Sequence, residues 1–293
     1  MHRGSVLSNG KHRPSIIIAS MLKGTSMSTQ ATELNRLTQR WERFRTNRNE
    51  ALADVHGWLT LTSFQWLPET PTAFDYIPGL WSVHEGKAVL NASAADGLSL
   101  VADSSTVDGT ISVQVSDEES VMWVSYGSVV VELGMRANRY MIRTRDAAAP
   151  TYTSFTGVPV FDYNPDLVLE GTFTAYEQPR TMVIETAHPE VPGVTELVGE
   201  VSFELDGQQH TLAAEAGGLG SLVVTFFDAS NNVSTAAWRK LELTKPRPDH
   251  SVVVDFNRSI NYPSAFSDFG TCPQPVAANT LSVPVEAGER NPR

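Results

Sequence analysis

The sequence has one cysteine, Cys272, among its 293 residues. A single thiol excludes an internal disulfide. This fits a reducing compartment, and we predict a cytoplasmic protein. Export is the alternative, because the apolar residues 16–22 follow a basic start, as in a signal peptide. We expect residues 1–27 to be a disordered or misassigned extension.

Positive charge and long apolar runs are also scarce. The chain has 22 Lys and Arg against 33 Asp and Glu, for a net charge of -11. Nucleic acids and anionic membranes favour clustered Lys and Arg, and no apolar run approaches the roughly 20 residues that span a bilayer. We therefore predict neither nucleic acid nor a membrane as a partner.

Several motifs of known chemistry are missing. The seven histidines show no metal-ligand spacing, and neither HExxH nor CxxC occurs. The glycine-rich residues 217–221 lack the lysine of a phosphate-binding loop, and no G-x-S-x-G turn of an α/β-hydrolase is present. We predict no metal and no cofactor.

Near the N-terminus, apolar residues recur every three or four positions and predict an amphipathic helix over residues 28–56. The members of this stripe are Leu34, Leu37, Trp41, Phe44, Ala51 and Val55, with Arg48 as the interruption. We place Arg40, Glu42, Arg43, Arg45 and Glu50 on the solvated face of the helix.

After Gly57 the apolar period changes to two, as in half-buried strands. Val201, Phe203 and Leu205 alternate with polar residues, for example. We expect hairpin turns at residues 85–86, 127, 206–207 and 231–232, where Gly, Asp and Asn supply positive φ angles. The pattern predicts an all-β fold: an antiparallel β-barrel or sandwich with the N-terminal helix packed on it, and residues 57–290 forming a single domain.

One strand, residues 139–145, carries three arginines on one face. A period of two places Arg139, Arg143 and Arg145 on the same side as Met141. Planar guanidinium groups bind carboxylates and phosphates, so Arg143 and Arg145 are candidate anion ligands. The alternative is an exposed face that forms salt bridges with the many acidic residues.

The C-terminal segment is rich in polar and rigid residues. Asp255 can orient an arginine, while Asn257 and Tyr262 can border a ligand; the alternative is that these side chains satisfy the backbone of a loop. Cys272 is a candidate nucleophile if a cation or a helix end lowers its pKa. Otherwise it is a small buried apolar residue.

The order of motifs resembles a known family. Residues 255–258, 271–273, Asn279 and 287–290 resemble the C-terminal signature of the uncharacterised bacterial family called domain of unknown function 1684. Residues 57–61 with 66–67, and residues 139–146, are similar to its opening motif and its central strand. The family often has a second cysteine where this chain has Ser264, which argues against a two-thiol mechanism. The resemblance implies a fold and no activity.

These observations lead to three hypotheses. The first is a β-barrel-like protein that binds a small anionic organic molecule through Arg143, Arg145, Asn257 and Tyr262, which requires that the arginine strand and the C-terminal segment meet at one cavity. The second is a hydrolase with Asp146 or Asp255 as general base near the arginines. The third is a non-catalytic interaction protein that pairs through its helix. The sequence leaves the oligomeric state open.

Overall fold

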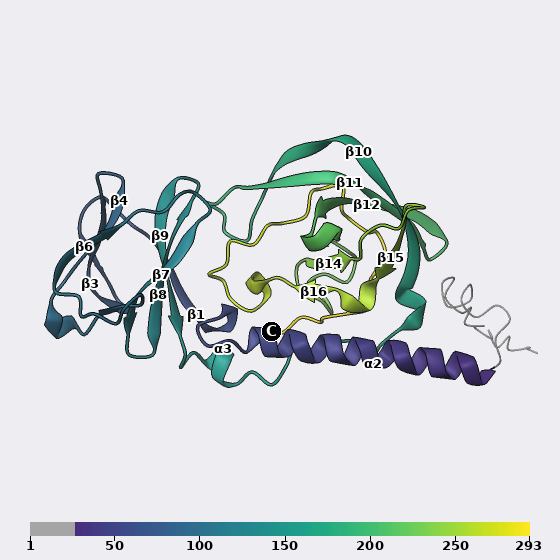
Figure 1. Cartoon of the computed structure of the whole chain (residues 1–293), viewed down its shortest axis with the longest axis horizontal. Coiled ribbons are helices and arrows are strands. Elements are labelled where there is room, and N and C mark those ends of the chain that lie inside the picture. Colours follow the sequence, from purple (N-terminus) through teal and green to yellow (C-terminus); the bar gives the residue numbers. More distant parts are fainter. Residues whose placement is uncertain (1–26) are drawn as a thin grey trace, which may run out of the picture.

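The computed structural model describes residues 27–293, and side chains from residue 31 onward. The predicted extension, residues 1–27, lies outside this range except for Met27, where the long helix α2 (Met27–Leu52) begins. After α2, the described chain forms three antiparallel sheets (Figure 1). This arrangement confirms the predicted all-β fold with one N-terminal helix.

The first half of the chain forms two sheets that pack face to face. The four-stranded sheet has the order β2-β3-β4-β6, and the five-stranded sheet has the order β1-β9-β8-β7-β5. The strands are β1 (Leu61–Trp66), β2 (Thr72–Phe74), β3 (Ile77–His84), β4 (Lys87–Ala92), β5 (Ser99–Leu100), β6 (Gly109–Val113), β7 (Ser120–Tyr126), β8 (Val129–Arg136) and β9 (Arg139–Asp146). Between the sheets, Trp81 packs edge-to-face on Trp123 with ring centroids 5.6 Å apart, and both are buried.

The second half forms one curled sheet of order β15-β10-β11-β12-β13-β14-β16. A short helix, α3 (Pro150–Thr153), precedes it. The strands are β10 (Val168–Ile184), β11 (Gly193–Leu205), β12 (Gln208–Ala216), β13 (Leu222–Phe226), β14 (Arg239–Leu243), β15 (Ser251–Asp255) and β16 (Ile260–Asn261). Its curl encloses a separate apolar core that includes Phe226, Leu241 and Phe256.

The C-terminal tail completes this second core. β12 and β13 pair only through two residue pairs and then diverge. Asn279 bridges the gap: its side chain accepts from Ala213 N (2.7 Å) and donates to the carbonyls of Ala213 (2.9 Å) and Thr225 (2.8 Å). Beyond Asn279, the apolar side chains of Leu281 and Val285 enter the core. The amide therefore supplies the hydrogen bonds that a neighbouring strand would otherwise provide.

Helix α2 lies along the seven-stranded sheet, at the bottom of Figure 1. Leu37, Trp41 and Phe44 are partly buried on its inner side, as the stripe predicted. The placement of Arg45 on the solvated face is wrong, because Arg45 is 7% exposed and binds Glu289. The register of α2 thus turns two arginines, Arg45 and Arg48, toward a buried carboxylate. No helix in residues 27–293 combines the length and apolar character needed to cross a membrane.

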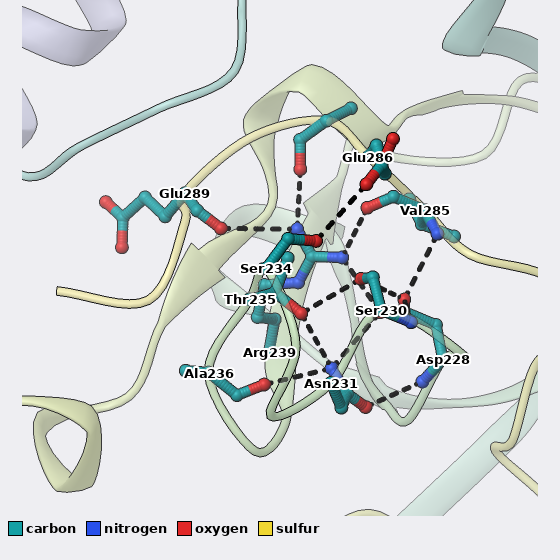
Figure 2. Close-up of polar contacts among 11 residues, drawn as sticks. Asp228, Ser230, Asn231, Ser234, Thr235, Ala236, Arg239, Val285, Glu286 and Glu289 are labelled. Atoms are coloured by element: carbon teal, nitrogen blue, oxygen red, sulfur yellow. Dashed lines mark hydrogen bonds and ion pairs between the residues drawn. The ribbon is translucent and has the colours of Figure 1, made fainter. Parts of the chain in front are cut away.

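The predicted turns at residues 85–86, 127 and 206–207 connect β3 to β4, β7 to β8 and β11 to β12. The tight turn expected at residues 231–232 is wrong, because β13 ends at Phe226 and β14 begins only at Arg239. The connecting loop is held by its own side chains (Figure 2): Asp228 accepts from Ser230 N (2.8 Å), and Asn231 donates to Ala236 O (3.0 Å). Local hydrogen bonding by Asp, Ser and Asn here replaces a hairpin.

Candidate functional site

The arginines of β9 are buried and paired. Arg143 and Arg145 are 1% and 4% exposed, and both bind Glu132, which is 3% exposed. Arg145 also donates to the carbonyls of His56 (3.1 Å) and Gly57 (2.7 Å). The side chains share one face as predicted, yet Glu132 of β8 already occupies the position expected for an anionic ligand.

The charges of this triad do not balance. Burial opposes ionisation of Glu132, but the positive charges of Arg143 and Arg145 outweigh it, so the pKa of Glu132 is lowered. One carboxylate therefore faces two guanidinium groups. Arg143 Nε and Nη1 are buried without a hydrogen-bond partner.

Asn257 and Asp255 form a structural corner next to α2. Asp255 accepts from Asn257 N (3.1 Å) and Nδ2 (2.9 Å). Asn257 also exchanges hydrogen bonds with the backbone of Asn164, and its carbonyl accepts from Trp41 Nε1 (3.0 Å). Burial raises the pKa of Asp255. Every polar group of Asn257 is thus engaged within the protein.

Tyr262 and Cys272 are buried residues that follow the edge strand β16 in the chain. The Tyr262 hydroxyl shares a hydrogen bond with Thr225 Oγ1 (2.8 Å), and burial raises its pKa to about 12. Burial also raises the pKa of the Cys272 thiol, although Ser264, Arg143 and Lys240 oppose this. The cations Arg143 and Lys240 would favour a reactive thiolate, yet burial outweighs them.

Asp146 follows β9 and stabilises a turn. It accepts from Ser128 Oγ (2.7 Å) and from Ala148 N (2.8 Å). The arginine strand and the C-terminal tail approach one another at Arg143 and Cys272, which interact electrostatically. Asp255 instead lines a different space beneath α2, whereas Asn257 does not.

That space is a groove of about 760 Å³ between α2 and the outer face of β13, β14 and β15, which we call the α2 groove. Its apolar walls include Leu37, Trp41, Phe44, Val223, Val253 and Ile260. Six basic residues also line it: Arg36, Arg40, Lys240, Lys245, Arg247 and Arg258. Three acidic residues, Glu33, Glu242 and Asp255, accompany them. Neither Arg143 nor Arg145 lines this groove.

Lys240 links the α2 groove to Tyr262 and Cys272. It lies opposite Thr225 in β13 and Ile260 in β16, so its side chain leaves the outer face of the sheet. Its Nζ lies 5.2 Å from the centroid of the Tyr262 ring. Burial, followed by the charge of Arg48, lowers the pKa of Lys240, although Glu242, Cys272 and Glu215 oppose this. Burial raises the pKa of Glu215.

Lys240, Glu215 and Glu132 were missed from the sequence. The alternation of Arg239–Leu243 places Lys240 opposite the apolar Leu241 and Leu243, which is ordinary for a strand with one solvated face. Only the covering helix α2 makes this face a groove. A metal centre lacks support in residues 27–293, where no three His, Cys, Asp or Glu side chains come together to hold an ion.

The family model that matches this chain covers its second half. Residues 153–290 match the family model described as protein of unknown function (DUF1684). A solution NMR structure of an uncharacterized protein of Haloarcula marismortui is similar at 31% sequence identity and a TM-score of 0.40, over 47% of this chain and 78% of that chain. No curated protein matches the sequence. The residues that match the family model include all seven strands of the curled sheet and most of the C-terminal tail.

Proposed function

The chain belongs to the DUF1684 family of proteins of unknown function, and we propose that it binds a small anionic organic molecule in the α2 groove. The observation that carries the proposal is the lining of the groove, which combines apolar walls with twice as many basic as acidic side chains. We assign the anion to this groove instead of to Arg143 and Arg145, because Glu132 already binds both of those arginines.

The lining of the α2 groove is opposite in charge to the chain as a whole. The chain as a whole carries a net charge of -11, so most of its surface repels an anion. The α2 groove reverses this sign locally. A concave site lined by one sign of charge raises the local concentration of ligands of the opposite sign.

The apolar walls define the rest of the ligand. Small-molecule sites commonly enclose about 300–1,000 Å³ and are mostly apolar with a few placed polar groups, and the α2 groove falls within this range. Trp41 and Phe44 from α2 face Val223 and Ile260 from the sheet across it. The ligand class that fits is an amphiphilic anion, such as a medium-chain carboxylate.

Arg40 and Lys245 are exposed basic residues of the groove that can bind that carboxylate. Arg36 is paired with Glu33 at 2.6 Å, and Arg258 lies over the Phe44 ring at 4.4 Å. Arg40 and Lys245 form no ion pair within 4 Å in the part of the chain that the structure describes. We therefore assign the carboxylate to Arg40 and Lys245 at the rim.

The test is calorimetric titration of the full chain with decanoate. We expect saturable binding, no binding of decyltrimethylammonium, and an affinity that falls with rising salt concentration. The double variant Arg40→Gln/Lys245→Gln should weaken decanoate binding about five- to tenfold, from two partly exposed ion pairs. The matched control Arg43→Gln/Lys87→Gln removes two exposed cations outside the groove and should leave the affinity unchanged. Equal binding of the cationic probe, or equal losses in both double variants, overturns the proposal.

A further inference from the structure

We propose that Lys240 is a reactive amine that condenses with the aldehyde or ketone group of an anionic molecule bound in the α2 groove, forming an imine. The inference rests on the proposed function, because the groove first has to bind the anion. It adds a substrate class, carbonyl compounds with a separate negative charge, and it assigns a covalent step to one named residue.

The geometry around Lys240 suits a nucleophile. The residue lines the groove, its side chain forms no hydrogen bond or ion pair within residues 27–293, and its Nζ lies 5.2 Å from the centroid of the Tyr262 ring. A lysine in a structural ion pair has a carboxylate held at the ammonium, which favours the charged form. Lys240 has no ion-pair partner within residues 27–293 and lies over the Tyr262 ring instead, and the free amine is the form that attacks a carbonyl.

Ionisable groups from four segments of the chain interact with Lys240. Arg48 of α2 adds positive charge, while Glu242 of the same strand, Glu215 of β12 and Cys272 of the tail act in the opposite sense. Burial is the largest influence, and the net result is a lowered pKa. Desolvation and a neighbouring cation are the two devices that activate lysine amines in enzymes.

The proposed reaction conserves electrons and needs no further reactant. The Lys240 nitrogen bonds to the carbonyl carbon, and the carbonyl oxygen takes up a proton to give a carbinolamine. The carbon–oxygen bond then breaks, the nitrogen electron pair completes the C=N bond, and the oxygen leaves as water with the two hydrogens of the amine. Glu215 is the acid that we assign to this proton transfer, because its strand β12 and the strand of Lys240 both pair with β13 and the two side chains interact electrostatically; burial also raises the pKa of Glu215.

Cys272 is the competing nucleophile, and two observations disfavour it. Its thiol is 6% exposed, and burial raises its pKa, so little thiolate forms near neutral pH. It also does not line the α2 groove. An adduct at Cys272 is therefore an outcome that would contradict the proposal.

The experiment traps the imine. The full chain is incubated at neutral pH with 10-oxodecanoate, the aldehyde counterpart of decanoate, and cyanoborohydride, and the product is mapped by peptide mass spectrometry. The chain has only five lysines, so peptide mass spectrometry can measure the labelling of each one separately. These are Lys11, Lys23, Lys87, Lys240 and Lys245. We expect Lys240 to be the predominant labelled site and to react faster than Lys87 or Lys245, because burial lowers its pKa and more of its amine is uncharged. Excess decanoate should suppress the labelling.

The pH profile and two variants distinguish the possible failures. The rate at Lys240 should reach its plateau at a lower pH than the rate at Lys87. Lys240→Met should abolish the adduct while decanoate still binds, and Glu215→Gln should slow labelling with little change in decanoate affinity. Uniform labelling of the lysines, with decanoate binding intact, overturns this inference and leaves the proposed function standing. Absence of decanoate binding overturns both.

Discussion

At the scale of single residues, Glu132 supplies the negative charge that pairs with the two buried arginines of the five-stranded sheet. Within residues 27–293 it is the one carboxylate that binds both Arg143 and Arg145, and all three residues are at most 4% exposed. Breaking a buried ion pair by removing one partner leaves an uncompensated charge in a medium of low dielectric constant. The stability of β8 and β9 should therefore depend strongly on this one carboxylate.

We predict that Glu132→Gln lowers the free energy of unfolding by about 3–5 kcal/mol, the cost of stranding a buried charge. Urea unfolding followed by fluorescence measures it. The control is Glu190→Gln, which removes the exposed ion pair with Arg139 and should cost no more than about 1 kcal/mol. Equal losses in the two variants would show that Glu132 carries no special weight.

The contribution of Glu132 should also depend on pH in a defined direction. Its pKa is lowered in the folded protein, so its carboxylate stabilises the fold above the ordinary glutamate pKa. That contribution disappears as the pH falls through the lowered value. The stability difference between the natural chain and Glu132→Gln should therefore be constant near neutral pH and shrink in acid, as urea titrations at a series of pH values would reveal.

The position of Glu132 could have been inferred from the sequence. Residues 137 and 138 form the turn between β8 and β9, with φ angles of 51° and 57°, and Arg136 pairs with Arg139. Counting outward from that turn places Glu132 opposite Arg143. A single acidic residue inside the apolar strand β8 was the signal. Lys240 had no comparable signal, because its environment is made by α2, nearly 200 positions earlier in the chain.

At the scale of elements, α2 is held to the curled sheet by polar contacts at its inner face. Glu289, fully buried near the chain end, accepts from Arg45 Nη1 (2.9 Å) and Arg48 Nε (3.1 Å), and its second oxygen accepts from Asn261 N (2.6 Å). Trp41 adds its bond to the Asn257 carbonyl. The helix thus joins two segments of the tail, and its apolar stripe is only part of the attachment.

We predict that Glu289→Gln loosens α2, because two arginines lose their common carboxylate. The expected loss of stability is about 3 kcal/mol. Hydrogen exchange should accelerate over residues 37–52 and remain unchanged in β3 and β4. Glu286→Gln is the matched control, three residues earlier and exposed. Unchanged exchange in α2 would assign its attachment to the apolar side chains instead.

The sequence predicted α2 well and its register less well. The spacing of Leu37, Trp41 and Phe44 identified the inner face. Arg45 follows Phe44 directly and was assigned to solvent, because a charged residue is normally exposed. A buried carboxylate contributed by residue 289 reverses that expectation. No local pattern in α2 can indicate a partner so distant along the chain.

At the scale of the whole molecule, two apolar cores coexist in one chain. One lies between the two N-terminal sheets and the other inside the curled sheet. Contacts bridge them: the ring of His188, between β10 and β11, packs at a tilt against Phe64 of β1 with centroids 4.5 Å apart, and Glu190 pairs with Arg139 of β9 at 2.9 Å. A small cluster of Leu52, Leu59, Val158 and Phe266 joins further segments of both halves.

Alternating patterns identified the antiparallel strands and several hairpins, because each depends on neighbours in sequence. The division of the apolar residues into two cores depends on how sheets assemble. Val131 of β8 and Val201 of β11, for example, have similar patterns and lie in different cores. Whether residues 57–290 form a single domain, as predicted, therefore depends on whether the two cores unfold together.

We expect residues 57–290 to unfold as one unit, because an apolar cluster and an aromatic ring contact join the two halves. Leu133→Ala and Leu241→Ala each create a cavity in a different core and should each cost about 2–5 kcal/mol. In a cooperative molecule both variants lower the midpoint of the same single calorimetric transition, whereas Val233→Ala, at an 83% exposed position, leaves it unchanged. Two independently folding halves would instead give two calorimetric transitions. Each core variant would then shift one of two transitions and leave the other in place, and the bridging contacts would hold the halves side by side without coupling their stability.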